Sequence, residues 1–202
     1  MKLEKMIQWL EKQEACPDGI EWVRKCGTGD PVRLIRTAIK SGKIEQLEWC
    51  NWGIVRLLTK RERVMYAVYA AQQCLHLFEK KYPGDDRART AIEAARRYTK
   101  RQTRANVSAA WSAGSAAGSA ARSAGSADWS AWSAAGSAMS AAWSAAETVG
   151  SAARSAGSAA WSAGSAAMSA AWSAESARSA WSAAYKNILK YGIKLLKSRE
   201  KD

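Results

Sequence analysis

The sequence predicts an all-α protein, and three observations support this fold class. Between residues 108 and 184 Ser-Ala doublets recur every three or four residues. From residue 108 to residue 173, with Thr148 counted as a Ser substitute, their spacing averages about 3.6 residues, the period of an α-helix. Apolar residues in the first hundred positions also recur at helical spacing, between helix caps. No stretch keeps the alternation of a half-buried strand. We expect an N-terminal helical bundle followed by a long antiparallel helical hairpin rich in Ala, Ser, Gly and Trp.

The first helices are predicted from apolar spacing and caps. Residues 3–10 place their apolar side chains on one helical face. Asp30 before Pro31 is an N-cap followed by proline at the first helical position. This pair opens a helix that runs through Ile39 and stops near the Ser-Gly pair at 41–42.

The next helices follow directly along the chain. Residues 43–58 are predicted to form one helix. Thr-Lys-Arg-Glu at 59–62 is a capping box, and it starts an apolar run that lasts to Phe78. Tyr-Pro-Gly at 82–84 ends that helix. Asp85 or Asp86 is expected to cap another helix that extends to about Tyr98.

The Ser-Ala repeat is expected to pack as a hairpin. On a helical wheel one stripe collects Trp and Gly residues: Trp111, Gly114, Gly118, Gly125, Trp129, Trp132, Gly136 and Trp143. Glycine costs about 1 kcal/mol at a helix-interior position, so this stripe needs a packing reason. Folding the segment at 147–150 sets large residues against small ones, with Gly136 opposite Trp161. The alternatives are one continuous helix, whose Trp stripe a homo-oligomer would cover, and several short helices.

Charge divides the chain into three parts. Residues 1–104 form a basic all-helical domain, residues 105–184 the repeat hairpin, and residues 185–202 a basic amphipathic helix expected to dock on the bundle. The net charge is +9 over residues 1–106, zero over 107–184 and +4 over 185–202, within a total of +13. This balance favours anionic partners, and it argues against mimicry of nucleic acid.

Several classes of protein are not supported by the sequence. No apolar segment follows Met1 as in a signal peptide, and the repeat is too polar for a membrane span, so a cytoplasmic location is expected. The four cysteines lack zinc-site spacing and are expected to be small buried apolar groups. No nucleotide-binding or hydrolase motif occurs. We expect no metal, no cofactor and no enzymatic activity.

One basic cluster and two tryptophans are the candidate ligand-binding residues. Arginine offers planar, bidentate donors that suit phosphate, and tryptophan can stack on a base. A solvated helix face and a core position are the plain alternatives for the two groups. The candidates are Arg87, Arg89, Arg96, Arg97, Lys100, Arg101, Arg104, Trp49 and Trp52.

Several motifs resemble one known family. They are Ala-Cys-Pro-Asp-Gly-Ile-Glu-Trp at 15–22, Trp-Cys-Asn-Trp at 49–52, and Tyr-Ala-Val-Tyr-Ala-Ala at 66–71. The run from Phe78 to Arg87, with Ala-Ile-Glu-Ala-Ala at 91–95, is the most distinctive. These residues resemble the alanine-rich putative immunity proteins (Imm-like) of bacteria and phages. The motifs cover residues 15–98, and the remainder is similar by composition, with Trp, Gly and Ser where relatives often have Tyr and Ala.

The resemblance implies a non-catalytic neutralising protein of immunity or anti-defence type that binds and sequesters a toxin or immune effector. It supplies no established functional residues. The alternative that the charge leaves open is a sponge for a small anionic nucleotide signal, such as a cyclic nucleotide or an ADP-ribose derivative. Sequence-independent nucleic-acid binding is the third hypothesis.

Overall fold

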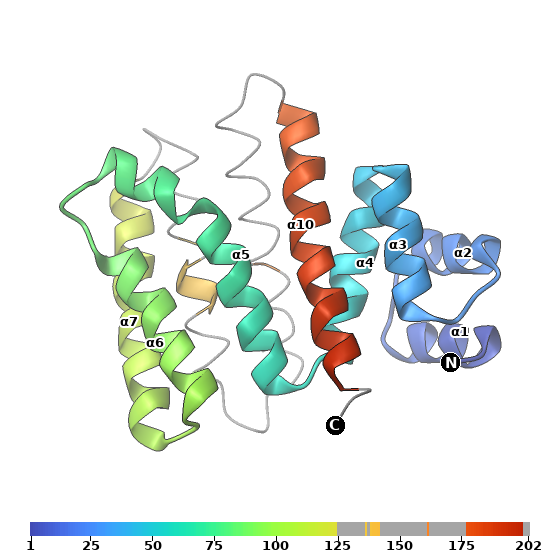
Figure 1. Ribbon diagram of the computed structural model, residues 1–202, viewed down its shortest axis with the longest axis horizontal. Helices are drawn as coiled ribbons and strands as arrows, with labels where there is room; N and C mark the ends of the chain where they lie inside the picture. The colour runs from blue at the N-terminus through green and yellow to red at the C-terminus, as the bar shows by residue number, and fades with distance from the viewer. Residues whose placement is uncertain (125–135, 137, 142–160, 162–176, 200–202) are drawn as a thin grey trace.

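The computed structural model describes residues 1–124, 136, 138–141, 161 and 177–199, and within these the chain is all-α, as predicted. The helices are α1 (Leu3–Lys12), α2 (Pro17–Cys26), α3 (Pro31–Ser41), α4 (Ile44–Leu57), α5 (Lys60–Lys81), α6 (Arg87–Lys100), α7 (Arg104–Ala124) and α10 (Ala177–Ser198). In Figure 1 they form an elongated array, with α1 and α2 at one end and α6 and α7 at the other.

The expected caps form. Asp30 accepts a hydrogen bond from the backbone N–H of Val32 at 3.0 Å, and Gly42 ends α3 with a φ of 69°. The Thr59 and Glu62 side chains form the capping box at the start of α5. Asp85 accepts from the N–H of Arg87 at 3.1 Å, at the start of α6.

Helix α2 was not predicted as a helix. Its own signals are proline at the first position, Pro17, and Gly27 at the C-cap with a φ of 65°. Only Gly19 and Val23 are buried, so its apolar periodicity is short. Together with α1 and α3 it encloses a small core of Met6, Leu10, Val23 and Leu34.

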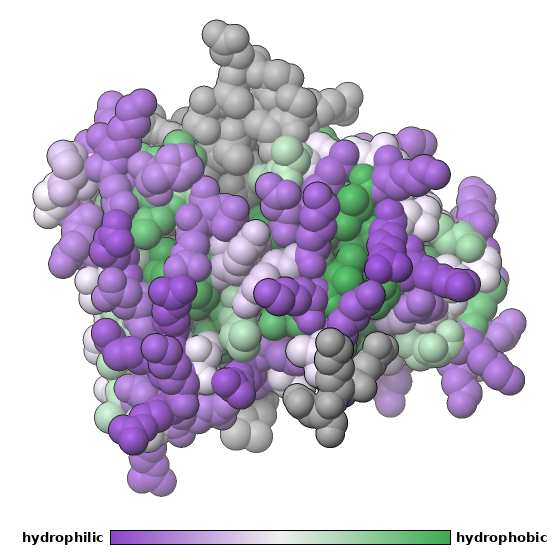
Figure 2. Space-filling model, in the orientation of Figure 1, coloured by the Kyte–Doolittle hydropathy of each residue, from purple (hydrophilic) through white to green (hydrophobic). Residues whose placement is uncertain are grey.

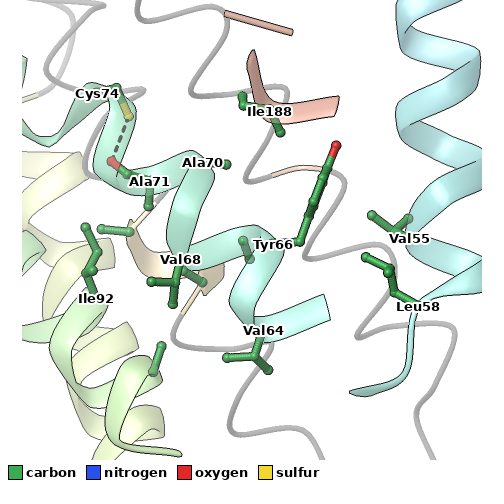
Figure 3. Close-up of a cluster of buried hydrophobic side chains, with 14 of the residues drawn as sticks. Val55, Leu58, Val64, Tyr66, Val68, Ala70, Ala71, Cys74, Ile92 and Ile188 are labelled. Atoms are coloured by element: carbon green, nitrogen blue, oxygen red, sulfur yellow. Dashed lines mark hydrogen bonds between the residues drawn. The ribbon is translucent and has the colours of Figure 1, made fainter. Parts of the chain in front are cut away.

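The C-terminal helix α10 lies between α4 and α5, although residues 82–176 separate it from α5 in the sequence (Figure 1). Its Ile188 and Leu189 are fully buried in the main core. Figure 3 shows Tyr66 of α5 pointing toward Ile188, with Val55 and Leu58 nearby. The expected docking of the terminal helix on the bundle is therefore confirmed.

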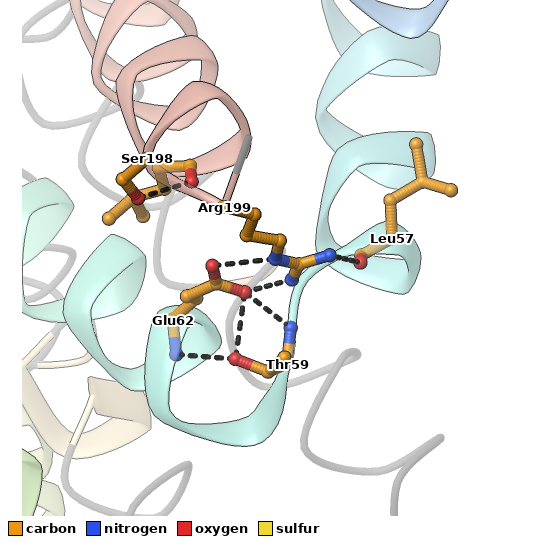
Figure 4. Close-up of polar contacts among 6 residues, drawn as sticks. Leu57, Thr59, Glu62, Ser198 and Arg199 are labelled. Carbon is orange, nitrogen blue, oxygen red and sulfur yellow. Dashed lines mark hydrogen bonds and ion pairs between the residues drawn. The ribbon is translucent and has the colours of Figure 1, made fainter. Parts of the chain in front are cut away.

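Polar contacts tie the end of α10 to the α4–α5 turn (Figure 4). Arg199 donates to the Glu62 carboxylate, with one distance of 2.7 Å, and to the carbonyl of Leu57 at 3.0 Å. The same carboxylate accepts from the N–H and the hydroxyl of Thr59, both at 2.7 Å. The capping box of α5 thus also anchors the C-terminal segment.

The predicted hairpin falls mostly outside the described residues, including its turn at 147–150. One of its pairings can be seen: a Cβ added at Gly136 would lie 3.0 Å from the Trp161 ring, so these residues face each other as the register predicts. The open end of the hairpin differs from the prediction, because among the described helices α7 packs mainly on α6, whereas α10 packs on α3, α4 and α5. The rest of the hairpin stays a prediction. On α7, Gly114 and Gly118 are buried, whereas Trp111 is 57 % exposed.

Candidate functional site

The structure places the predicted site residues in two separate regions. Trp49 and Trp52 belong to α4, whereas the predicted arginines and lysine lie on α6 and at the start of α7. Figure 1 shows α10 and α5 between α4 and α6. The tryptophans and the basic residues therefore do not form one site.

Two of the predicted arginines, both at the start of α6, form ion pairs with acidic side chains. Arg87 binds Asp85 through its side chain, with an Nε–Oδ1 distance of 2.8 Å. The Arg89 guanidinium lies 2.5 Å from the Glu79 carboxylate of α5. The hydrogen bond from Arg87 lowers the pKa of Asp85. These contacts hold the α5–α6 connection, which gives the two arginines a structural role.

The other basic residues gather where α6 ends. We call this surface the basic end, and it consists of exposed side chains: Arg61, Arg96, Arg97, Lys100, Arg101 and Arg104. Arg61 belongs to α5, and its Nε donates to the carbonyl of Thr99 at 2.9 Å. Figure 2 shows hydrophilic side chains over this part of the molecule, at the lower left. The helix dipole places partial negative charge at the C-terminal end of a helix, and cations there interact favourably with it, so part of the cluster stabilises α6.

Hydrogen bonds hold the turn between α6 and α7, which carries Arg101 of the basic end. Asn106 donates from its amide to the carbonyl of Arg101 at 2.7 Å, and its backbone N–H donates to the Thr103 hydroxyl at 3.2 Å. In a different part of the bundle, Tyr69 of α5 and Tyr191 of α10 stack, with ring centroids 4.2 Å apart and planes at 11°. Burial raises the pKa of Tyr191, and the Arg96 charge opposes that rise. The charge of Arg96 therefore acts on an aromatic pair that the sequence did not reveal.

Trp49 and Trp52 line a cavity of about 390 Å³ between α1, α2, α3 and α4. Two further tryptophans, Trp9 and Trp22, belong to its wall, and the Trp22 and Trp49 rings lie 6.0 Å apart at 47°. Most of the remaining lining is apolar, including Met6, Leu10, Leu34, Ile35 and Ile54. A volume of this size can hold a small molecule.

The ionisable groups around this cavity differ from those expected for an anion site. Its ionisable lining consists of two carboxyl groups, Glu14 and Glu48, and the Cys16 and Cys50 thiols, with no Lys, Arg or His among the described residues. Arg56 stacks on Trp52 with 3.7 Å between its guanidinium carbon and the ring centroid, and donates to the Trp52 carbonyl. Burial and the charge of Glu45 raise the pKa of Glu48.

The cysteines were expected to be buried, and this is wrong for Cys16, which is exposed at the cavity. Cys26 is half-buried, and Cys50 and Cys74 are buried as predicted. Within the described ranges no three His, Cys, Asp or Glu side chains come together as a metal site would require. None of the described helices has both the length and the apolar character needed to cross a membrane.

Comparisons with known proteins agree with the resemblance. A family model described as Imm-5 like putative immunity protein matches residues 54–178. The match begins within α4 and includes α5, α6 and α7, together with all residues of the basic end. No curated protein and no solved structure matches the chain.

Proposed function

Because the chain belongs to the Imm-5 like putative immunity protein family, we propose that it binds and sequesters a protein toxin or immune effector. Family membership is the observation that carries this proposal, and it suggests a non-catalytic role. The matched region contains the basic end, which is the strongest concentration of positive charge on the matched helices. We infer that the basic end contacts an acidic surface of the partner.

The physical properties of the basic end suit such a contact. Five of its six side chains are Arg, the sixth is Lys100, and all six are exposed. Arginine binds carboxylates through two parallel hydrogen bonds and is enriched at the energetic centres of interfaces. The Asn106 and Thr103 contacts hold the backbone of the turn, which limits the entropy lost on binding.

The experiment is a growth-rescue assay with a toxin gene found beside the open reading frame. We expect the wild-type chain to restore growth and Arg96→Glu, Arg97→Glu, Arg101→Glu to lose rescue and binding. Steering by charge predicts an association rate that falls at least tenfold. The matched control reverses three exposed lysines of α1 and α3: Lys5→Glu, Lys12→Glu, Lys40→Glu. Equal rescue by both folded variants would contradict the assignment of the contact surface, and failure of the wild type would contradict the function.

The alternative is capture of a small anionic nucleotide. The stacked Tyr69 and Tyr191 pair, on which the charge of Arg96 acts, favours it, because a base stacks on aromatic rings and a phosphate binds arginine. Native mass spectrometry of the purified chain distinguishes the two functions. A nucleotide-sized mass released on denaturation, with absorbance near 260 nm, would replace the toxin-binding proposal. If the chain bound any nucleic acid with an affinity that falls steeply with salt, this would instead support sequence-independent nucleic-acid binding.

A further inference from the structure

We propose that the tryptophan-lined cavity binds a small organic cation with an apolar body, such as an alkyl- or aryl-ammonium ion. The cavity lies almost wholly before residue 54, where the family match begins. The proposal is therefore independent of the basic end and of toxin binding. Three properties of the cavity carry it: its aromatic walls, its charge and the local stability given up to form it.

The walls suit a cation with an apolar body. Four indoles, from α1, α2 and α4, contribute to the lining, and tryptophan has the most favourable ring face for a cation. The Arg56 guanidinium already lies on the Trp52 ring, so that ring serves as a cation acceptor within this protein. The apolar residues between the indoles would contact the ligand body.

The charge of the lining selects the same class of ligand. In a chain of net charge +13, the charged side chains lining this cavity are the carboxylates Glu14 and Glu48. Glu45 adds a third negative charge near Glu48, and Arg56 is the cation beside the wall. Burial, followed by the charge of Glu45, raises the pKa of Glu48, so this carboxylate is partly desolvated and has a like charge near it. A bound cation would place a positive charge next to these carboxylates.

Two backbone positions at the cavity are unfavourable for stability. Glu14 has a φ of 55°, at a position after α1 where glycine is usual. Gly53 lies inside α4, and a Cβ built there meets nothing within 4 Å. Alanine would be better for the helix at that position. Glu14 places a carboxylate at the cavity, and Gly53 leaves space there. Such local costs concentrate at functional sites.

The test compares three probes of similar size by isothermal titration calorimetry at low salt: benzyltrimethylammonium, benzyl alcohol and benzoate. We expect benzyltrimethylammonium to bind at least fivefold more tightly than the other two. It should also slow alkylation of Cys16 by iodoacetamide, because this exposed thiol lines the cavity. Equal affinity for the neutral probe, or no binding of the cation, would overturn the proposal.

Variants then locate the site. Glu48→Gln should weaken binding of the cation about fivefold, the equivalent of one favourable cation contact. Glu93→Gln, which removes an exposed carboxylate on α6, is the matched control and should leave affinity unchanged. Gly53→Leu should fill the cavity and abolish binding while the melting temperature holds. Unchanged affinity in folded Glu48→Gln and Gly53→Leu proteins would remove the cavity as the site.

A final variant separates binding from folding. Glu14→Gly removes a carboxylate at the cavity and relieves the positive φ. We expect a higher melting temperature together with weaker binding of benzyltrimethylammonium. If the Glu14 side chain had a purely structural role, Glu14→Gly would lower the melting temperature and leave the affinity for benzyltrimethylammonium unchanged. This result would contradict the proposal.

Discussion

Two glycines inside helices should respond in opposite ways to the same substitution. Gly53 lies within α4, where an added Cβ meets nothing within 4 Å. Gly192 lies within α10, where an added Cβ would be 2.3 Å from Ile54 Cδ1 and 2.9 Å from Tyr66 Cε2. Helix propensity favours alanine at both positions. Only packing distinguishes them.

The magnitudes follow from these distances. Gly53→Ala should stabilise the protein by about 1 kcal/mol, the difference in propensity between the two residues. Gly192→Ala gains the same amount, but Ile54 must move and the Tyr66 ring, with 0 % exposure, has little room to do so. Overpacking of this kind costs about 1–3 kcal/mol. We expect Gly192→Ala to be destabilising, and the two variants to differ by about 2 kcal/mol.

The assay is urea unfolding followed by circular dichroism at 222 nm, with the slope of the transition checked for each variant. Both proteins have the same composition change, so the comparison cancels the difference in helix propensity. If Gly192→Ala were as stabilising as Gly53→Ala, α10 could not approach α4 and α5 as closely as the structure shows. The packing of the C-terminal helix would then need revision.

Three further outcomes can be measured on the same protein. Asp85→Asn should reduce the loss of stability in acid. The hydrogen bond from Arg87 lowers the pKa of Asp85 in the folded protein, so the ionised carboxylate stabilises the fold above about pH 4. This stability is lost as the pH falls through the lowered pKa of Asp85. The measurement is thermal unfolding from about pH 2 to about pH 6, roughly two pH units either side of the ordinary pKa of an aspartate. Iodoacetamide should modify exposed Cys16 in the native state, and buried Cys50 and Cys74 only after unfolding, as mass spectrometry of peptides would show. Thr59→Ala should cost about 1 kcal/mol of unfolding free energy in urea, because it removes the cap of α5.

Much of the N-terminal fold could be predicted because its helix boundaries are local. Asp30 before Pro31, and Thr59 with Glu62, satisfy backbone groups within a few residues, so the sequence contains both partners. Helix α2 was missed because it is short and buries little, although Pro17 marks its start. The pairing of Gly136 with Trp161 was predictable because the size pattern of the repeat is regular.

The candidate site was harder to predict, because it depends on which helices meet. The sequence suggested Trp49 and Trp52 as residues that stack on a base, beside a basic cluster. The structure places them with Trp9 and Trp22, from α1 and α2, instead. No local pattern links residues 9, 22 and 49, since they line one cavity only when three helices pack together. Likewise, the partner of Arg89, Glu79 of α5, is evident only when α5 and α6 are paired, whereas the partner of Arg87, Asp85, lies two residues away in the sequence.

The packing of α6 against α7 explains why the basic residues can all point outward. The buried residues of α6 are mainly alanines, such as Ala91 and Ala95, and those of α7 include Ala110 and Ala117. Alanine lets helix axes come close, but each one buries little apolar surface. On α6 the buried residues, which pack on both α5 and α7, occupy somewhat less than half of the helix circumference. The rest of the α6 circumference is free for arginine, which a helix with a wide apolar face would not allow. The alanine-rich composition and the basic surface are thus two consequences of one mode of packing.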